Sequence, residues 1–472
     1  MNRRYATLAV LAAVALAGGC AVGPRYAEPE VPKIELASAE KAQFSTVSGA
    51  RSPWWSFFED PELERLIGAA LDGNHDVRQA YASLLAARAV FDERELDRYP
   101  AVTAQASYRR SIQQQATPGG DPERKPAETF RAGFDAQWEI DLFGRLAHLS
   151  RSAQANAEAA QAELDGMRLA IAADVARYHY EYLGLQRRLE VARAEAENWR
   201  RTVRLVQAGV EQGRGLREDL ENARANLARS EAAIAPLLAS AQETRYRLDV
   251  LLGRRPGETP VGQGMQRQAP LVGRLPLGDA DFLIRRRPDV VRAERLLAAS
   301  TEDVGAATAD LYPRLSLGGF IGFFALRGGD LGSAARAFEV GPTVDWPAFR
   351  LGSARARLRA SQARSAGASA RYEQVLLQAQ EEVERALTRL AREQERLAAL
   401  AQSASHAQAA LDIATRRYRL GAGPYLAVLE NQRSYYQISQ EAAQAETASY
   451  VNAVALYKAL GWGMDDAGRE HP

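Results

Sequence analysis

The chain has 472 residues, and its 60 Lys and Arg residues almost balance its 59 Asp and Glu residues, which leaves a formal net charge of +1. Nucleic-acid binding needs a basic excess that neutralises phosphate, so this balance argues against a nucleic-acid partner. None of the four lysines follows a glycine, which excludes a phosphate-binding GxxxxGK[ST] loop. The five histidines show no metal-ligand spacing and are expected on the surface or on helix faces. A P-loop nucleotide hydrolase and a zinc hydrolase are therefore both disfavoured.

The first 19 residues have the features of a secretory signal peptide. A short basic stretch over residues 2–4 precedes an apolar run over residues 6–17, which is too short to span a bilayer. The small residues before the single cysteine, Cys20, resemble a bacterial lipoprotein cleavage box, although Ala17 stands where such boxes usually have leucine. The resemblance implies a diacylglycerol and an acyl chain on Cys20 and delivery to the outer membrane. The alternative is an ordinary signal peptide and a buried cysteine.

The two halves of the chain repeat one another. At an offset of 213, residues 74–80 match residues 287–293, and Tyr99-Pro100 matches Tyr312-Pro313. At an offset of 208, Gly213–Gly215 matches Gly421–Gly423, and Leu252-Gly253 matches Leu460-Gly461. Such spaced self-similarity indicates that one structural unit has been duplicated.

The repeats and the composition between them predict six segments. These are a signal peptide (1–19), a lipid anchor and N-terminal tether (20–60), a first structural repeat (61–254), a linker rich in Pro and Gly (255–278), a second structural repeat (279–462) and a C-terminal tail (463–472).

Each repeat is predicted to contain a helix, two strands, a very long helix and a return helix. The predicted helices cover residues 61–97, 144–208 and 216–252 in the first half and 279–310, 351–420 and 424–460 in the second. At 1.5 Å per residue, a long helix would measure about 100 Å. Apolar residues between Val375 and Leu390 keep a coiled-coil-like seam, which we assign to core packing. No later stretch is apolar over 18 residues, so no membrane-spanning helix is expected.

Four segments with a period of two are predicted to be strands. They lie at 102–109, 130–141, 315–324 and 338–346. Apolar residues alternate with polar ones, although Phe320 and Phe324 fall on a face that otherwise carries glycines. A membrane barrel strand with lipid outside and water inside needs this pattern, but a soluble, half-buried sheet would give it too. Four strands cannot close a membrane barrel, which needs about eight, so several chains would have to combine.

Ordered motifs across nearly the whole chain carry a family resemblance. They are Cys20-Ala21-Val22-Gly23-Pro24-Arg25-Tyr26, residues 54–63 (Trp-Trp-Ser-Phe-Phe-Glu-Asp-Pro-Glu-Leu), residues 74–80, residues 138–145 (Trp-Glu-Ile-Asp-Leu-Phe-Gly-Arg), residues 286–290 (Arg-Arg-Pro-Asp-Val), and Tyr425-Leu426 followed by Leu429 and Gln432-Arg433. In these motifs the chain resembles the outer membrane factor family, the TolC-type efflux lipoproteins, and within it the NodT subfamily.

The resemblance implies a mainly α-helical fold with a small β part. The expected assembly is a homotrimer with a long α-helical coiled-coil periplasmic barrel and an outer-membrane β-barrel of four strands per chain and twelve per trimer. The resemblance also implies docking to a periplasmic membrane-fusion adaptor and an inner-membrane pump, and contact with outer-membrane lipid.

The resemblance assigns a gate and docking turns to the junctions between the long helices and the return helices. The docking candidates are Gly209, Gly213, Gly215, Glu218, Asp219, Gly421 and Gly423. No strand precedes the Gly-x-Gly spacing, which disfavours a dinucleotide site. Leu426, Glu430 and Arg433 match the family positions of an apolar ring, an acidic ring and an ion-pairing arginine, although the family more often has aspartate at the acidic position. Leu426 and Glu430 are one helical turn apart and share a face.

Three functions are compatible with this pattern. The favoured one is a passive exit duct for small toxic molecules or drugs, without catalytic residues, metal or cofactor. A duct of a type I protein secretion system would have the same fold. A soluble periplasmic coiled-coil adaptor would share the long helices and the lipid anchor, but it has one helical hairpin, so the duplication argues against it.

Overall fold

The computed structural model describes residues 21–30, 33, 36, 53–115, 123–258, 280–326 and 332–461. The predicted signal peptide, Cys20, most of the predicted linker and the predicted tail lie outside the described residues. The first half contains η2 (Trp54–Phe58), α2 (Pro61–Gly73), α3 (His75–Leu96), β1 (Ala101–Gln115), β2 (Glu123–Ile140), α4 (Arg145–Glu211), α5 (Arg217–Ala232) and α6 (Ile234–Leu251).

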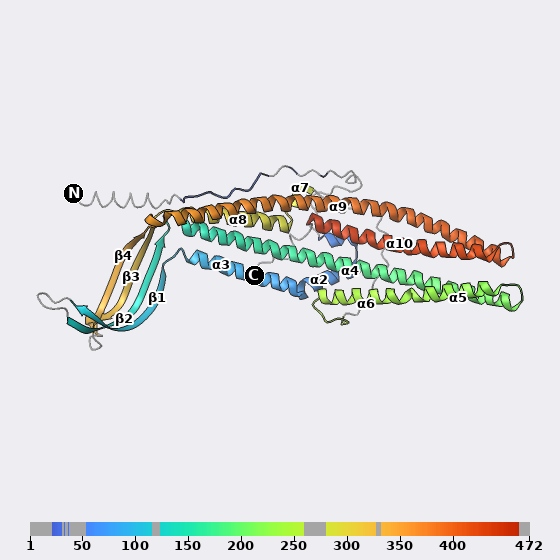
Figure 1. The fold of residues 1–472 in the computed structure, drawn as a ribbon, viewed down its shortest axis with the longest axis horizontal. Coiled ribbons are helices and arrows are strands. Elements are labelled where there is room, and N and C mark those ends of the chain that lie inside the picture. The colour runs from blue at the N-terminus through green and yellow to red at the C-terminus, as the bar shows by residue number, and fades with distance from the viewer. Residues whose placement is uncertain are drawn as a thin grey trace. The chain divides into compact units, whose positions relative to one another are not determined.

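The second half repeats this order (Figure 1). It contains α7 (Ala280–Arg285), α8 (Pro288–Ala309), β3 (Arg314–Ala325), η4 (Ser333–Ala335), β4 (Arg336–Asp345), η5 (Ala348–Arg350), α9 (Leu351–Arg419) and α10 (Tyr425–Leu460). The predicted class, mainly helical with a small sheet, is confirmed.

Three predicted helices are each divided into two. Asn74 adopts an extended conformation and starts α3, because its Oδ1 atom accepts hydrogen bonds from the backbone N–H groups of Asp76 at 2.8 Å and Val77 at 3.2 Å. Before Pro288 the helical conformation is disfavoured, which separates α7 from α8. Between α5 and α6 the chain breaks at Ala233. Hydrophobic periodicity continues through such breaks and does not reveal them.

The described residues belong to two compact units, each assembled from separate stretches of the chain. Unit 1 (1–30, 83–161 and 292–373) contains the sheet, and unit 2 (31–82, 162–291 and 374–472) contains the turns that follow the long helices. Each long helix contributes residues to both units.

The sheet of unit 1 is antiparallel throughout and has the order β1-β2-β3-β4. The two hairpins, one from each half, are joined by the pairing of β2 with β3, which runs from Phe130 opposite Ala325 to Ile140 opposite Leu315. Strands β1 and β4 are the two edges of this sheet (Figure 1).

Equivalent positions of the two halves make equivalent contacts. In unit 1, the indole N–H groups of Trp138 and Trp346 donate to the carbonyl oxygens of Arg98 at 2.9 Å and Leu311 at 3.2 Å. In unit 2, the side chains of Asn74 and Arg287 donate to the carbonyl oxygens of Leu251 at 2.9 Å and Ala459 at 2.6 Å, at the ends of α6 and α10. These matched bonds are the structural counterpart of the sequence repeat.

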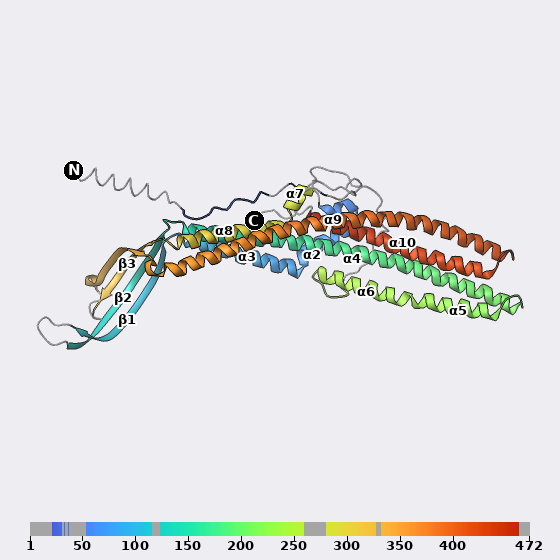
Figure 2. The same cartoon turned by 45° about the horizontal axis from the view of Figure 1, so that its top comes forward.

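In unit 2, the return helix α10 packs beside α4 and α9, and α5 packs beside α4 (Figure 2). Contact between α10 and α4 is close, because a Cβ atom at Gly184 would lie 2.0 Å from the Oγ1 atom of Thr447. The Tyr436 hydroxyl donates to the carbonyl of Ala194 at 3.2 Å along the same seam. Burial raises the pKa of Tyr436 to about 12.

An aromatic cluster joins η2 to α4 and α10 in unit 2. Its members are Trp54, Phe57, Phe58, Tyr180, Tyr450 and Tyr457. Next to it, the buried His179 contacts the Asp60 carboxylate at 2.8 Å, and Asp60 also caps α2 through the backbone N–H groups of Glu62 and Leu63. Of the two expected places for histidines, the surface or a helix face, His179 and His148 in unit 1 take the second, because both lie on α4 and are buried.

Candidate functional site

The sheet has one apolar and one polar face. Even-numbered positions of β1, β2 and β4 share the apolar face with odd-numbered positions of β3, because the register pairs Tyr108 with Phe130, Phe134 with Ile321 and Ile321 with Phe338. Its large side chains are 42–83% exposed in the isolated chain, namely Val102, Tyr108, Ile112, Phe134, Ile321, Phe323, Phe338, Val340 and Val344. The predicted alternation is therefore present on all four strands. A continuous exposed apolar surface of this kind marks a contact with lipid or protein.

Odd-numbered positions of β1, β2 and β4 form the polar face together with even-numbered positions of β3. They include Thr103, Gln105, Ser107, Arg109, Arg131, Asp135, Glu139, Glu339, Thr343 and Asp345. Arg131 is the most connected of them: its Nη1 atom donates to Gln105 at 2.9 Å and to Asp135 at 2.8 Å. This face can line an aqueous space while the other faces a membrane.

Residues 21–30 lie in a seat, which we define as Phe143, Gly144, His148, Glu302 and Gly305, on α4, α8 and the segment before α4. The backbone N–H of Val22 donates to the Phe143 carbonyl at 3.1 Å, and the Val22 carbonyl faces the His148 Nε2 atom at 3.1 Å. The other ring nitrogen of His148 contacts the Glu302 carboxylate at 2.6 Å. The seat thus combines residues of both repeats.

Glycines make room for the chain in this seat. A Cβ atom at Gly144 would lie 2.8 Å from the Cβ atom of Ala21, and one at Gly305 would lie 2.3 Å from two atoms of the His148 ring. Gly23 has a φ of +115° and packs on Gly305. Further along, the Tyr26 hydroxyl donates to Glu294, and burial raises the pKa of Tyr26.

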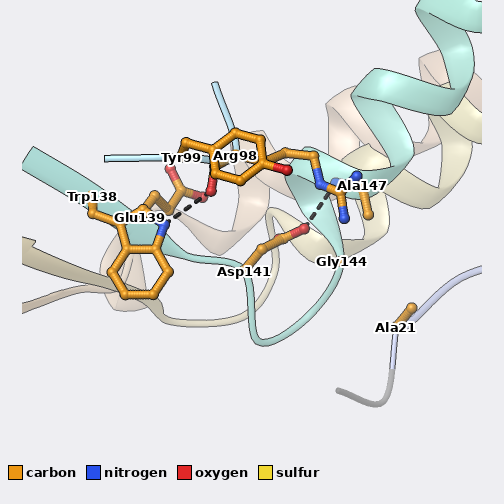
Figure 3. Close-up of a pocket in the computed structure, with 8 residues that line it drawn as sticks. All are labelled: Ala21, Arg98, Tyr99, Trp138, Glu139, Asp141, Gly144 and Ala147. Carbon is orange, nitrogen blue, oxygen red and sulfur yellow. Dashed lines mark hydrogen bonds between the residues drawn. The ribbon is translucent and has the colours of Figure 1, made fainter. Parts of the chain in front are cut away.

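A pocket of about 340 Å³ adjoins the seat. It is lined by Ala21, Arg98, Tyr99, Trp138, Glu139, Asp141, Gly144 and Ala147. Figure 3 shows Trp138 and Ala21 on opposite sides of it, with Asp141 between them accepting a 2.8 Å hydrogen bond from the Ala147 backbone N–H. Cys20, the predicted lipidation residue, lies outside the described residues, but its neighbour Ala21 is in this pocket beside the end of the sheet.

The two predicted turns of unit 2 have the same geometry. Gly213 and Gly421 have φ values of +73° and +70°, a conformation that favours glycine. In each turn the next residue donates to a carbonyl five positions earlier, Arg214 to Gly209 and Ala422 to Arg417, both at 2.9 Å. This pattern is a Schellman cap, which closes a helix without a side chain. Gly209 itself lies within α4, not in the turn.

A small core holds the four helix ends together beneath the turns. It consists of Val206, Leu220, Leu411, Tyr425 and Val428, from α4, α5, α9 and α10. Burial, followed by the nearby Tyr418 and Asp219, raises the pKa of the Tyr425 hydroxyl. The core fixes the first turn of α10, which carries Leu426.

The predicted gate residues face outward from this core. Leu426 is 61% exposed, and Glu430 and Arg433 are exposed as well. Within the described part of this single chain, no ion pair joins Glu430 to Arg433. Glu218 is exposed and Asp219 is half-buried in the other turn, and Gly215 and Gly423 precede the return helices in equivalent places. The structure of one chain therefore brings these residues to the same end of unit 2 without pairing their charges.

The two halves differ at the gate positions. The constant offset of 208 aligns Leu426 with Glu218, and it aligns Glu430 and Arg433 with Asn222 and Ala225. Only the second half therefore carries the apolar, acidic and basic set.

No described helix is long and apolar enough to cross a membrane. Among the described residues, no three His, Cys, Asp or Glu side chains gather in a group that could hold a metal ion.

Sequence comparison identifies the family. The sequence profile described as "Outer membrane efflux protein" matches residues 66–254 and 281–462, which include both halves of the chain. The chain belongs to the outer membrane efflux protein family.

Relatives of this outer membrane efflux protein match over nearly their full lengths. The outer membrane protein OprJ of Pseudomonas aeruginosa is 30% identical over 98% of this chain and 96% of its own length. The cation efflux system protein CusC of Escherichia coli K12 is 28% identical over 94% of this chain and 96% of its own length. The solved outer-membrane channel OprN is 40% identical, with a TM-score of 0.89 over 94% of this chain and 100% of that structure. The suspected family is confirmed.

Sequence reasoning missed the seat of this outer membrane efflux protein. His148 and Glu302 are 154 positions apart and meet only because α8 packs on α4. The available signal was Gly305, since a glycine within an otherwise helical pattern often has a packing reason.

Proposed function

We propose that this protein is the outer-membrane exit duct of a tripartite efflux pump. It passively conducts small toxic molecules or drugs, which an inner-membrane pump and a periplasmic adaptor deliver, to the exterior. No residue of the chain performs covalent chemistry in this role, and the energy comes from the pump.

The two-faced sheet is the observation that carries the proposal. Its exposed apolar face would cost free energy in water at about 25 cal/mol per Å², and lipid removes that cost. The polar face would then line the aqueous path. Trp138 and Trp346 stand at the same end of the two hairpins, where membrane barrels carry aromatic girdles. Membership of the outer membrane efflux protein family supports the same location.

Free sheet edges support a trimer. Strands β1 and β4 are edges in the single chain, and a lipid-exposed edge would leave backbone groups without hydrogen-bond partners. Pairing β4 of one chain with β1 of the next satisfies both edges, and three chains supply twelve strands. The proposed assembly is thus a homotrimer with one shared barrel.

The seat supports a lipid anchor on Cys20. Because Ala21 and Val22 are fixed beside the end of the sheet, a diacylglycerol and an acyl chain on the preceding cysteine would start at the level of Trp138. The anchor would then enter the same leaflet that surrounds the barrel.

The turns of unit 2 are the proposed docking and gating end. The adaptor contacts the turns around Gly213 and Gly421 together with Glu218 and Asp219. Three copies of Glu430 face one another around the trimer axis, so their carboxylates repel each other and attract cations. Arg433 from the same or a neighbouring chain offsets that charge and sets the resting state.

Native mass spectrometry of the detergent-extracted protein from the outer-membrane fraction tests assembly and anchor together. We expect the mass of three mature chains, each starting at Cys20 with acyl groups. A soluble monomer without acyl groups would contradict the duct and would favour a periplasmic coiled-coil protein. A trimer without acyl groups would support the duct and contradict the lipid anchor on Cys20.

A duct for secreted proteins would have the same fold. The relatives CusC and TtgI are named as a cation efflux system protein and a toluene efflux pump outer membrane protein, which favours small cargo. Deleting the gene and measuring drug sensitivity and the secreted proteins separates the two: increased sensitivity with unchanged secretion supports efflux, and the reverse supports secretion.

A further inference from the structure

Two phenylalanines break the polar pattern of the face that would line the duct. Phe320 and Phe324 are the only aromatic residues on the polar face of the four paired strands. Phe320 lies opposite Asp135 on β2 and Glu339 on β4, and Phe324 lies opposite Arg131. Water inside a barrel gives no reason for exposed aromatic rings at these positions, so they require an explanation of their own.

Phe320 has a structural role. Its ring covers Gly133 and Gly322, where an added Cβ atom would lie 2.8 Å and 3.0 Å from ring atoms. The Arg131 guanidinium lies over the other side of the ring, with its central carbon 3.9 Å from the centroid. Phe320 is consequently only 8% exposed. Covering glycines with a neighbouring aromatic ring stabilises a sheet, which accounts for this residue.

Phe324 has no such role. It is 44% exposed and stands directly across from Arg131, whose guanidinium is held in place by Gln105 and Asp135. At the matching positions of β1, the offset of 213 places Ser107 and Ser111 instead of Phe320 and Phe324. The same strand of the repeat therefore folds without either ring, and the fold does not demand an exposed aromatic residue here.

The charges around the rings leave a negative excess toward β4. The Arg131 guanidinium is paired with Asp135, whereas Glu339 is exposed beside Phe320 and no ion pair involving it is found among the described residues. Arg109 is farther away, on β1. A planar guanidinium and an exposed ring offer stacking surfaces, and the exposed Glu339 carboxylate, which also interacts electrostatically with Arg131, favours a cation beside them.

We infer that Arg131, Phe320, Phe324 and Glu339 form a stacking platform on the inner wall of the duct that binds flat aromatic cations during their passage. Phe324 and the Arg131 plane contact the aromatic ring, and Glu339 interacts with the positive group. This inference rests on the proposed function, because it takes the polar face as the wall of the duct. Each chain contributes one platform, so a trimer has three.

The test compares variants of the full-length protein in a non-ionic detergent by ligand-observed saturation-transfer NMR. The probe is 1-naphthylmethylammonium, and cyclohexylmethylammonium is the saturated control with the same charge. Phe324→Ala should weaken binding of the naphthyl probe about three- to fivefold, since a contact between two aromatic rings has that magnitude. The matched control is Phe323→Ala, because Phe323 is 42% exposed and faces the opposite side of the sheet; it should change binding less than twofold.

A second variant tests the charge. Glu339→Gln should weaken binding of the naphthyl cation about twofold and leave neutral 1-naphthalenemethanol unchanged, because an exposed ion pair contributes little. Equal effects of the Phe324 and Phe323 substitutions, or equal binding of the two ammonium probes, would overturn the inference.

The binding measurement does not require an open gate, so the proposed function is tested separately. Ion conductance of the wild-type protein in a planar bilayer supports the duct, and its absence contradicts it. If the wild-type protein conducts ions but the variants and probes do not differ in binding as expected, the stacking platform is contradicted and the proposed duct is not.

Discussion

Buried titratable residues fix the segments that precede the two repeats. In unit 2, the 1% exposed His179 contacts Asp60, and Asp60 caps α2 with the same carboxylate. In unit 1, the equally buried His148 contacts Glu302 and the backbone of Val22. Each histidine therefore links an element near the N-terminus to the long helix α4. In unit 2 the polar contact adds to the apolar packing of Trp54 and Phe58 next to it.

The Asp60 carboxylate should make the protein more stable above pH 4 than below it. Burial alone would raise its pKa, but the hydrogen bond from His179 and the backbone N–H groups at the start of α2 outweigh this and lower the pKa. A lowered pKa gives stability that is present above the unfolded value of about 3.9 and is lost as the pH falls through the folded value. Asp60→Ala removes both contacts and should cost at least about 1 kcal/mol at pH 7, the usual value of an N-cap.

Thermal unfolding at pH 7 and pH 3 measures this prediction. Asp60→Asn is the matched variant, because an amide oxygen can still cap α2 while the charge is lost. We expect an intermediate midpoint at pH 7 and a smaller loss on acidification than in the wild type. Equal midpoints of the wild type and both variants at pH 7 would show that neither contact matters.

Gly305→Ala should release the N-terminal segment from its seat. The added Cβ atom would lie 2.3 Å from atoms of the His148 ring, so the ring or the helix must move. Overpacking of this kind costs about 1–3 kcal/mol. Hydrogen exchange of residues 21–30 should become faster in this variant.

The control for the seat is Gly367→Ala in α9. No atom lies within 4 Å of the position that its Cβ atom would take, so this substitution should stabilise the helix by about 0.5–1 kcal/mol and leave exchange of residues 21–30 unchanged. Equal exchange in both variants would mean that the seat does not hold the segment.

At the level of elements, the long helices end in matched caps, but the return helices present different side chains. Gly213 and Gly421 form the same Schellman cap, and the core of Val206, Leu220, Leu411, Tyr425 and Val428 joins the ends. On this shared scaffold the second half carries Leu426, Glu430 and Arg433. The two halves thus share one hairpin scaffold, and only the second half carries the charged residues of the proposed gate.

Glu430→Ala should lower the cation selectivity of the open duct severalfold, because three carboxylates around one axis create a local potential of several kT. Arg433→Ala should raise it. The equivalent residue of the first half provides the control, and Asn222→Ala should leave selectivity unchanged. Reversal potentials in a salt gradient across a planar bilayer measure the ratio of cation to anion permeability. A change of the same size in the Asn222 variant would place the charge-selective constriction elsewhere.

Sequence patterns predict the elements of this fold better than their breaks and long-range contacts. The sheet faces follow from a period of two, and the caps follow from Gly213 and Gly421, because each signal is local. The division at Asn74 is local as well, but a capping side chain within continuous apolar periodicity is easily overlooked. The seat around His148 depends on packing between distant helices, which no local pattern contains. The same holds for the position of Arg131 over Phe320.

For the whole molecule, the exposed apolar face is the feature that a single chain cannot accommodate in water. Nine large side chains of that face are exposed, and both sheet edges are unpaired in the isolated chain. In the proposed assembly, pairing between three chains closes the edges and lipid covers the face, so assembly and membrane insertion remove two different free-energy costs. The polar face is compatible with water and does not need to be covered by lipid. Substitutions on the two faces of one strand should therefore affect membrane insertion differently.

Val340→Arg should block insertion, whereas Thr343→Arg should permit it. Both residues lie on β4 and are exposed in the isolated chain, but they stand on opposite faces of the sheet. An arginine on the lipid face near the middle of the bilayer costs about 2–4 kcal/mol per chain, and a trimer incurs that cost three times. The folded, urea-resistant fraction in outer-membrane preparations measures insertion, and conductance measures the effect of the tolerated variant on ion flow. Equal losses for both arginine variants would mean that the apolar face does not contact lipid, and the proposed barrel would have to be abandoned. Loss of insertion for Val340→Arg alone, with an altered selectivity for Thr343→Arg, assigns lipid and water to the two faces.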